Sequence, residues 1–367
     1  MKYLFSIIVF LHGTIHLMGF AKGFKLAHIQ NLASEISTTS AIFWFVASSL
    51  FIISAVGFLL DKNFWLLFAI LAVAISSILI VSTWSDSKFG MIPNVVILLV
   101  VVISLASISM NKMTTRETQK ILSGIDSSAS KIITDTDVEE LPAPVYKWIQ
   151  NTGMIGKPAI RSVYAKQKAL MKMKPEQKDW KSAEAEQYAT MDVPAFIWTV
   201  TMNMAPLIKI KGRDKFVDGK GEMLIKINSL INVVNEKGER MDEGTMQRFL
   251  GELVWYPSLA LSPYISWETN DEFSAKATMN YNGTTGSGTF YFDEKGDFIK
   301  FIALRFKGNE ADAKRYPWIL TVDDYAVFEG IKVPSKMKAT WKLDEGDWTW
   351  LNLEITDIKY NITTIIN

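Results

Sequence analysis

The sequence predicts a four-helix transmembrane domain followed by a mainly antiparallel β domain, a curved sheet or partial barrel with one or two short helices. Charged residues are scarce up to residue 110, where five lysines and three acids stand against 34 basic and 35 acidic residues in the remainder. Beyond Ala159 the apolar residues recur with a period of two, which is typical of half-buried strands. At 367 residues, each part can bury a core of its own.

Four apolar segments follow one another in the first part of the chain, over about 3–20, 40–60, 64–83 and 92–108. Each approaches the roughly 20 residues that a helix needs to cross a bilayer. The middle two contain no charged residue. The first resembles a signal peptide because Lys2 precedes an apolar run, but three further spans follow it. We therefore expect an uncleaved first helix.

An even number of spans leaves both termini on one side of the membrane. Lysines and arginines near the ends of the spans favour cytoplasmic termini by five to three under the positive-inside rule. The sequence thus predicts an integral, multi-pass protein whose first partner is the lipid bilayer and whose C-terminal domain is cytoplasmic.

His12 and His16 lie four residues apart, on one face of the first expected helix. Such a pair is a candidate half-site for a metal, but a complete site needs further ligands. The third histidine is His28, outside the spans, and the chain has no cysteine. Three interpretations stay open. The rings pack and hydrogen-bond inside the bundle, they contact a polar or quinone-like ligand, or they bind metal or haem, with a homodimer supplying the missing ligands.

Composition places a four-helix transmembrane domain over 1–110, a polar linker over 111–140 and a β-rich soluble domain over 141–367. Asn282-Gly283, between two alternating runs, is the strongest short hairpin signal. The expected strands are 162–173, 182–190, 195–204, 209–217, 221–229, 273–281, 284–293, 298–306, 318–328, 332–343 and 347–360.

One helix is expected within the β domain, in "DEGTMQRFLGELVWYP", residues 242–257. Its apolar residues recur at helical spacing and should pack on the sheet. They are Met246, Phe249, Leu250, Leu253 and Val254. Arg248 and Glu252 stand at i and i+4 on another face, which predicts either a solvated ion pair or a polar pair at the mouth of a cavity.

The composition excludes several kinds of chemistry. Without cysteine there are no disulfides and no thiol nucleophiles, and without histidine beyond His28 the β domain has no Ser-His-Asp triad of its own. No glycine loop that cradles phosphate precedes a helix. The formal net charge of +1 gives no basic field for nucleic acid. The sequence therefore identifies no catalytic residue and no cofactor.

Tryptophan is abundant in the β domain. On a regular strand, Trp348 and Trp350 would lie opposite Leu351 and Leu353, so that both faces of the sheet carry large apolar groups. Such a sheet must be covered or must enclose an apolar ligand. The candidate ligand-binding residues are the aromatic Trp198, Trp255, Trp318 and Trp350 and the polar Arg213, Arg248, Glu252 and Arg305.

Several stretches resemble an uncharacterised bacterial family whose members have a β-rich domain, sometimes preceded by four membrane helices. They are "HGTIHLMGFAKGF", "WSDSKFGMIPN", "LPAPVYKWIQNTG", "GRDKFVDGKGEM", "RFLGELVWYPS", "GIKVPSKMKATW" and "ITDIKY". This resemblance implies no activity. The strand pattern also resembles the curved half-barrel of lipoprotein carriers, which implies a hydrophobic ligand and a domain on the non-cytoplasmic side.

The leading hypothesis is a membrane protein whose curved sheet binds a hydrophobic or lipid-like ligand near the bilayer. One alternative is a membrane redox or metal-handling protein that uses His12 and His16. Another is a non-catalytic domain that binds a partner through exposed strand edges.

Overall fold

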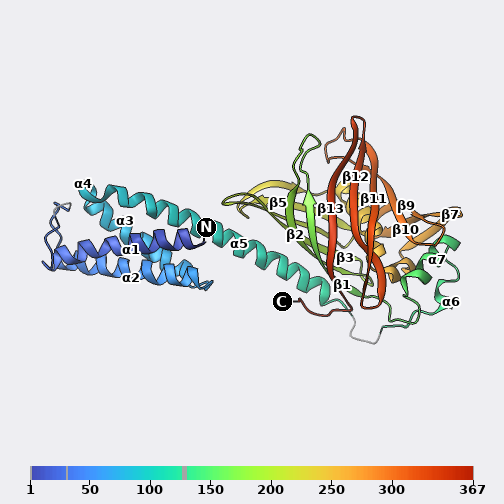
Figure 1. Cartoon of the computed structure of the whole chain (residues 1–367), viewed down its shortest axis with the longest axis horizontal. Helices are drawn as coiled ribbons and strands as arrows, with labels where there is room; N and C mark the ends of the chain where they lie inside the picture. The colour runs from blue at the N-terminus through green and yellow to red at the C-terminus, as the bar shows by residue number, and fades with distance from the viewer. Residues whose placement is uncertain (1, 30–31, 126–129, 367) are drawn as a thin grey trace. The chain divides into compact units, whose positions relative to one another are not determined.

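The computed structural model describes residues 2–29, 32–125 and 130–366. The chain divides into two compact units, Met1–Ser109 and Met110–Asn367. The predicted fold class is confirmed, because apolar helices come first and an antiparallel, curved half-barrel sheet with a few short helices follows (Figure 1).

The first unit is a bundle of helices. In the described residues, four helices are long and apolar enough to cross a membrane. Glycines let α1 approach α2 closely, since a Cβ on Gly19 would lie 2.3 Å from the Trp44 ring. Small residues allow this kind of close packing between membrane helices. The helical elements are α1 (Lys2–Gly23), α2 (Thr38–Leu59), α3 (Trp65–Ser82), α4 (Trp84–Ser87), the 3-10 turn η1 (Lys88–Gly90) and α5 (Met91–Leu122).

Helix α5 is longer than the span predicted over 92–108. It continues through polar residues to Leu122, so the first part of the expected polar linker is helical. The helix continues because no glycine or proline interrupts the sequence between Pro93 and Gly124. Its last residue is buried beside Tyr164 and Tyr188 of the sheet.

The second unit is built on one sheet, which has 13 antiparallel strands in the described residues. The strand order is β6-β5-β4-β3-β2-β1-β13-β12-β11-β10-β9-β8-β7, so β1 pairs with β13 and the edges are β6 and β7. The strands are β1 (Ser162–Met171), β2 (Lys181–Thr190), β3 (Ala195–Ala205), β4 (Ile208–Val217), β5 (Lys220–Ile227), β6 (Ile231–Glu236), β7 (Ile265–Asp271), β8 (Ser274–Tyr281), β9 (Thr284–Phe292), β10 (Phe298–Phe306), β11 (Arg315–Phe328), β12 (Ile331–Leu343) and β13 (Gly346–Tyr360).

The hairpin predicted at Asn282-Gly283 is confirmed. Both residues have positive φ, 48° and 80°, and Tyr281 pairs with Thr284 across the turn. This is the two-residue loop that matches the twist of the flanking strands. Both edge strands are absent from the sequence prediction. They are short and largely exposed, so any alternation of apolar and polar residues in them is too brief to mark a strand.

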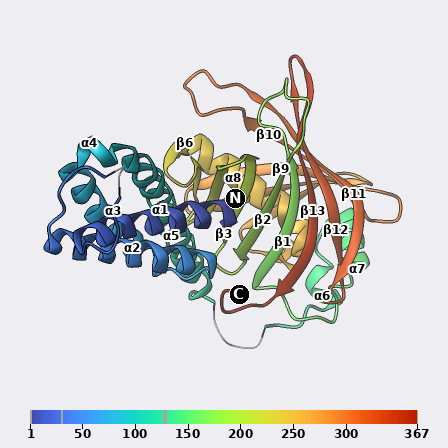
Figure 2. The same cartoon turned by 60° about the vertical axis from the view of Figure 1, so that its left-hand side comes forward.

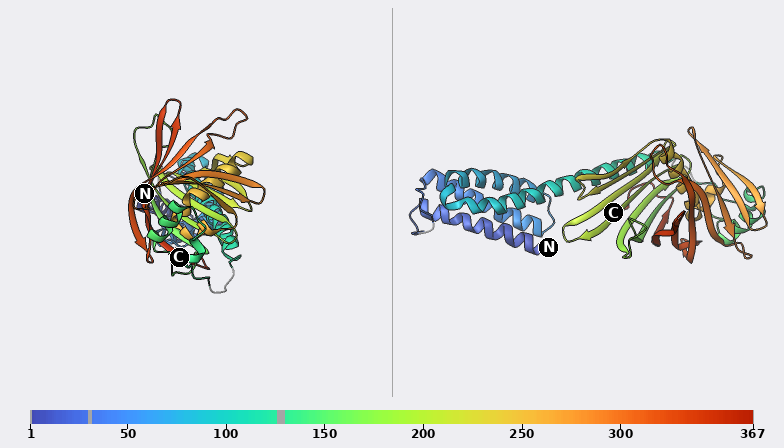
Figure 3. Two further views of the ribbon diagram at one scale, coloured as in Figure 1. Left: turned by 90° about the vertical axis from the view of Figure 1, so that its right-hand side faces the viewer. Right: turned by 90° about the horizontal axis from the view of Figure 1, so that it is seen from above.

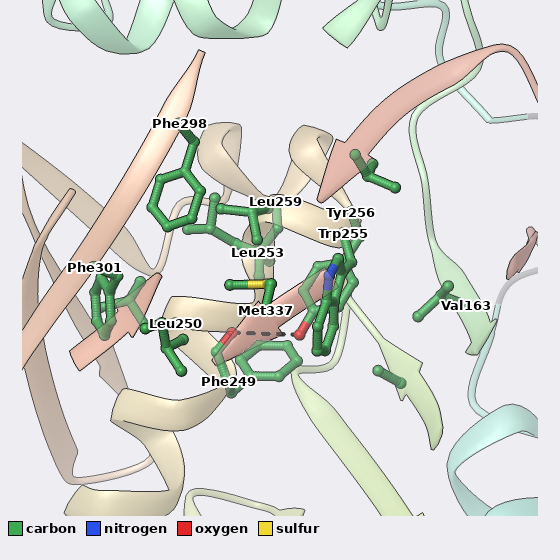
Figure 4. Close-up of a cluster of buried hydrophobic side chains, with 14 of the residues drawn as sticks. Val163, Phe249, Leu250, Leu253, Trp255, Tyr256, Leu259, Phe298, Phe301 and Met337 are labelled. Carbon is green, nitrogen blue, oxygen red and sulfur yellow. Dashed lines mark hydrogen bonds between the residues drawn. The ribbon is translucent and has the colours of Figure 1, made fainter. Parts of the chain in front are cut away.

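Helix α8 (Glu239–Gly251) lies on the concave face of the sheet (Figures 2 and 3). It contacts β4 and β5 near one edge and β8, β9 and β10 near the other, which requires the sheet to curve around it. The predicted apolar stripe is confirmed, because each of its residues is fully buried in the core. Figure 4 labels three of them, Phe249, Leu250 and Leu253. After Gly251 the chain tightens into the 3-10 turns η2 (Glu252–Trp255) and η3 (Pro257–Leu261).

One rim of the half-barrel is closed. The Thr284 hydroxyl, after the β8–β9 turn, donates a 2.8 Å hydrogen bond to the Gly219 carbonyl in the β4–β5 turn. Helix α7 (Ala143–Thr152) contacts β8 and β12 and buries Trp148 against Phe292. The short α6 (Asp135–Val138) precedes it and begins with a capping box at Thr134.

Candidate ligand-binding cavity

A cavity of about 470 Å³ lies between α8 and the concave face of the sheet. Its wall comes from α8 and from strands on both halves of the sheet, including β3, β4 and β10 to β13. The curvature brings these strands together, although they are far apart in the sequence. The cavity is therefore a product of the tertiary fold.

The structure brings seven of the eight predicted binding residues into the wall of this one cavity. Their role in binding stays a prediction. They are Trp198, Arg248, Glu252, Trp255, Arg305, Trp318 and Trp350.

Arg213 does not line the cavity. Successive residues of a strand point to opposite faces, and in β4 the neighbouring Asp214 is the one that lines the cavity. Arg213 instead forms ion pairs with Glu222 at 3.0 Å and with Glu117 of α5 at 3.3 Å. It links α5 to the outer face of the sheet, so it is the one predicted binding residue that lies outside this cavity, and its role in binding stays a prediction.

The expected alternation along β13 is also wrong. Ala339 of β12 pairs with Leu351 while the next residue, Thr340, pairs with Thr349, so Trp350 is an extra residue in a β-bulge. Because of this bulge, Trp348 and Leu351 occupy the same face, and both line the cavity. The apolar groups converge on one side of the sheet instead of covering both.

A buried ion cluster forms the inner wall. Arg248 bonds to Asp214 of β4 and to Glu252, both at 2.7 Å, and Gln187 donates a 2.7 Å hydrogen bond to Glu252. Burial raises the pKa of Asp214, and the attraction of Arg248 opposes that rise. Burial also disfavours the Arg248 cation, but Glu252 and Asp214 outweigh it and raise the Arg248 pKa. The Arg248–Glu252 pair is thus part of a buried network with Asp214 and Gln187. The expectation of a solvated Arg248–Glu252 pair is wrong.

Two tryptophans of the cavity wall donate hydrogen bonds to other residues of the protein. The Trp198 indole N–H donates to the Gln167 side chain at 2.8 Å, and the Trp255 N–H donates to the Pro334 carbonyl at 3.1 Å. Tyr256, fully buried beneath Trp255, donates to the Phe249 carbonyl (Figure 4). Burial raises the Tyr256 pKa well above its ordinary value, so this phenol stays neutral.

Sequence reasoning missed several wall residues, including the polar Gln167 and Asp214 and the aromatic Trp341. A signal exists for the polar ones, since a glutamine or aspartate at an inward position of an apolar strand face needs a buried partner. That signal depends on knowing which face is inward.

His12 and His16 lie inside the helical unit and are both buried. His12 Nε2 lies 2.9 Å from Asn94 Oδ1, and His16 Nε2 lies 2.8 Å from the Ser76 hydroxyl. His16 Nδ1 hydrogen-bonds to the His12 carbonyl at 2.8 Å. Among the described residues, no three His, Cys, Asp or Glu side chains come close enough to hold a metal ion.

The fold and the cavity define a curved antiparallel half-barrel that wraps one helix and follows a set of apolar helices in the sequence. The chain belongs to a family of unknown function, DUF6544, whose model matches residues 131–353. Among solved structures, the chain is similar to a LolA superfamily protein from Nitrosomonas europaea. The two share 6% identity, with 64% of this chain and 95% of that chain covered, at a TM-score of 0.32. A search of curated proteins finds no match.

Proposed function

We propose that this protein is a multi-pass membrane protein whose β domain holds a hydrophobic or lipid-like ligand near the bilayer. The observation that carries the proposal is the cavity of about 470 Å³ on the concave face, walled by tryptophans. That volume lies within the range of about 300–1,000 Å³ that is typical of small-molecule sites.

The cavity wall suits an apolar ligand. Leu320, Met337, Leu351 and Leu353 line it together with Trp318. Helix α8 covers only part of the concave face, and these side chains border the open space beside it. An apolar ligand would remove their surface from water, at about 25 cal/mol per Å².

The membrane part of the proposal rests on the four apolar helices. We place both termini in the cytoplasm, as the lysine and arginine count favours. A C-terminal green fluorescent protein fusion should be fluorescent, and a C-terminal alkaline phosphatase fusion should be inactive. The opposite result would place the β domain on the other side.

The cavity is tested by native mass spectrometry of the full chain, released from detergent micelles, with analysis of the extracted lipid. Leu351→Trp should fill the cavity and lower the co-purifying apolar ligand at least several-fold. The matched control is Leu304→Trp, on an exposed side chain of β10 that does not line the cavity. Equal ligand in both variants would mean that the bound lipid surrounds the helices, and would overturn the proposal.

A further inference from the structure

We infer that the ligand is an amphipathic anion, with a carboxylate or phosphate head at Arg305 and an apolar body along the tryptophan wall. This inference rests on the proposed function and deepens it by naming the chemical class of the ligand. It follows from the polar atoms that line the cavity and have no partner.

The unpaired polar atoms of the cavity wall are all hydrogen-bond donors. Buried side-chain atoms without a hydrogen-bond partner occur on six wall residues in the described chain, and each is a nitrogen that carries hydrogen. Among the described wall residues, no buried side-chain oxygen lacks a hydrogen-bond partner. The atoms are Gln167 Nε2, Arg240 Nη1, Arg305 Nε, Trp318 Nε1, Trp348 Nε1 and Trp350 Nε1.

The donor character of these atoms is fixed by chemistry. An indole nitrogen and a guanidinium can donate but cannot accept. The Gln167 amide has only one orientation that suits its neighbour, because its oxygen accepts the Trp198 N–H at 2.8 Å and its nitrogen is left for the cavity. A ligand that satisfies this set must present acceptors, and a carboxylate or phosphate presents several at one point.

Arg305 is the cation best placed to hold such a head. Its guanidinium lies 4.2 Å from the Trp318 ring centre and 5.7 Å from that of Trp341. Unlike Arg248, it has no carboxylate within 4.0 Å and no side-chain hydrogen bond in the described part of the chain. A planar guanidinium with free donors matches a carboxylate or phosphate bidentately.

The surrounding charges support this assignment. Burial and the repulsion of Arg248 lower the Arg305 pKa, which means that the cation is under-compensated. Asp214, Glu252 and Glu243 attract it from a distance, but the first two are already bound to Arg248 and Glu243 is bound to Arg315. The ammonium of Lys307 lies nearby, 4.7 Å from the Trp348 ring centre, and adds a second positive charge on the same side.

The body of the ligand would lie on the apolar part of the wall, against Met337, Leu351 and Leu353. These residues come from β12 and β13, and the same wall holds the tryptophans whose N–H groups have no partner in the described chain. The wall therefore combines the cations of Arg305 and Lys307, which lie over the tryptophans, with apolar surface from β12 and β13. That combination is the complement of a fatty acid or a phosphorylated lipid.

The test uses the full chain in nanodiscs of phosphatidylcholine, with a diazirine-bearing long-chain fatty acid and the corresponding fatty alcohol as probes. Photolabelled cavity peptides are quantified by mass spectrometry, so probe dissolved in the bilayer does not interfere. The acid should label the wild-type cavity about 10-fold more than the alcohol does, because charge-assisted hydrogen bonds to the head are lost with the alcohol. Arg305→Met should reduce acid labelling to the level of the alcohol.

Two further variants and a competitor complete the test. Arg305→Lys should retain part of the preference for the acid over the alcohol, since lysine keeps the positive charge but lacks the parallel N–H donors of a guanidinium. Lys314→Met is the control, on an exposed lysine outside the cavity, and should behave as wild type. Inorganic phosphate at the same concentration as the acid should not protect the cavity. Full protection by phosphate would assign the site to a free anion and overturn the amphipathic ligand.

The outcomes separate this inference from the proposed function. Equal labelling by acid and alcohol, unchanged in Arg305→Met, would overturn the anionic head and leave an apolar ligand site. No labelling of cavity peptides by either probe would overturn both. Hydrogen exchange of each variant confirms that the β domain is folded.

Discussion

The helical unit and the β-domain cavity both bury polar side chains among apolar ones, but the two regions differ in how those groups are paired. In the helical unit, His12, His16, Ser76 and Asn94 bond to one another and to the backbone. In the cavity, Arg305 and the tryptophans around it keep donors without partners.

The difference separates a structural role from a binding role. A buried donor without a partner is destabilising by about 1–3 kcal/mol, so a fold retains several of them at one place only when something else stabilises them. The helical unit also has unpaired atoms, on Ser6, Trp44 and Ser48, but two of these are hydroxyls, which can accept as well as donate. The cavity collects donors alone, as an anion site requires.

The largest effect is expected from removing the cation of the ion cluster that Arg248 forms with Asp214 and Glu252. Arg248→Met would leave Asp214 and Glu252 as buried carboxylates without their cation, and should lower the free energy of unfolding of the β domain by about 3–5 kcal/mol. The control Lys276→Met, in a more exposed pair with Glu268, should change it by less than about 1 kcal/mol. Urea unfolding followed by near-ultraviolet circular dichroism measures both. Similar small losses would show that the cluster is not a closed unit.

The next effect tests the network of the helical unit. Asn94→Leu removes the partner of His12 and of Ser76, and should lower the stability of the bundle by about 1–2 kcal/mol. Unfolding of the full chain in mixed micelles with increasing sodium dodecyl sulfate measures this loss. Ser49→Ala, which removes one bond to the Phe45 carbonyl on its own helix, is the matched control. Photolabelling of the cavity should be unchanged by either substitution.

A third prediction concerns pH and the ion pairs that Glu222 makes with Arg213, Lys215 and Lys237 on the outer face of β4 and β5. Burial opposes the ionisation of Glu222, but hydrogen bonds from Lys237, Lys215 and Arg213 outweigh it and lower its pKa from 4.5 to about 2. The ionised group therefore stabilises the fold above pH 4.5, and this contribution is lost as the pH falls from 4.5 towards about 2. We expect about 1 kcal/mol after screening by solvent.

Urea titrations across that pH range measure the slope. Glu222→Gln should flatten it, whereas Glu272→Gln, in the exposed β7–β8 turn, should leave it as in the wild type. A slope that survives in Glu222→Gln would assign the acid sensitivity to other carboxyls.

The smallest effect has the opposite sign and sharpens the comparison most. Arg305→Met removes a half-buried cation that has no ion pair or side-chain hydrogen bond in the described part of the chain, so the empty protein should be as stable as the wild type or more stable, by about 0.5 kcal/mol. Urea unfolding of protein stripped of lipid measures it. A fall of about 2 kcal/mol or more in the free energy of unfolding would mean that Arg305 has a structural partner. Arg305 would then be a paired structural residue, as Asn94 is in the helical unit.

Much of the fold could be predicted because its signals are local. The length of the apolar segments, the alternation around Asn282-Gly283 and the helical stripe from Met246 to Val254 each depend on a short window of sequence. The structure has the corresponding helices, hairpin and buried stripe. The edge strands β6 and β7 were missed because they are short and mostly exposed, and β7 has only Ile265 fully buried.

The sequence by itself thus determined the two-part architecture, the strand-rich C-terminal unit, and the lack of histidine and cysteine in it. Only the tertiary structure decided which side chains meet. Arg213 points outward while Asp214 points inward, and the bulge at Trp350 moves Trp348 onto the cavity face. The physical reason is that a shift of one residue in pairing reverses the face of every side chain beyond it, and pairing is set by strands far apart in the chain.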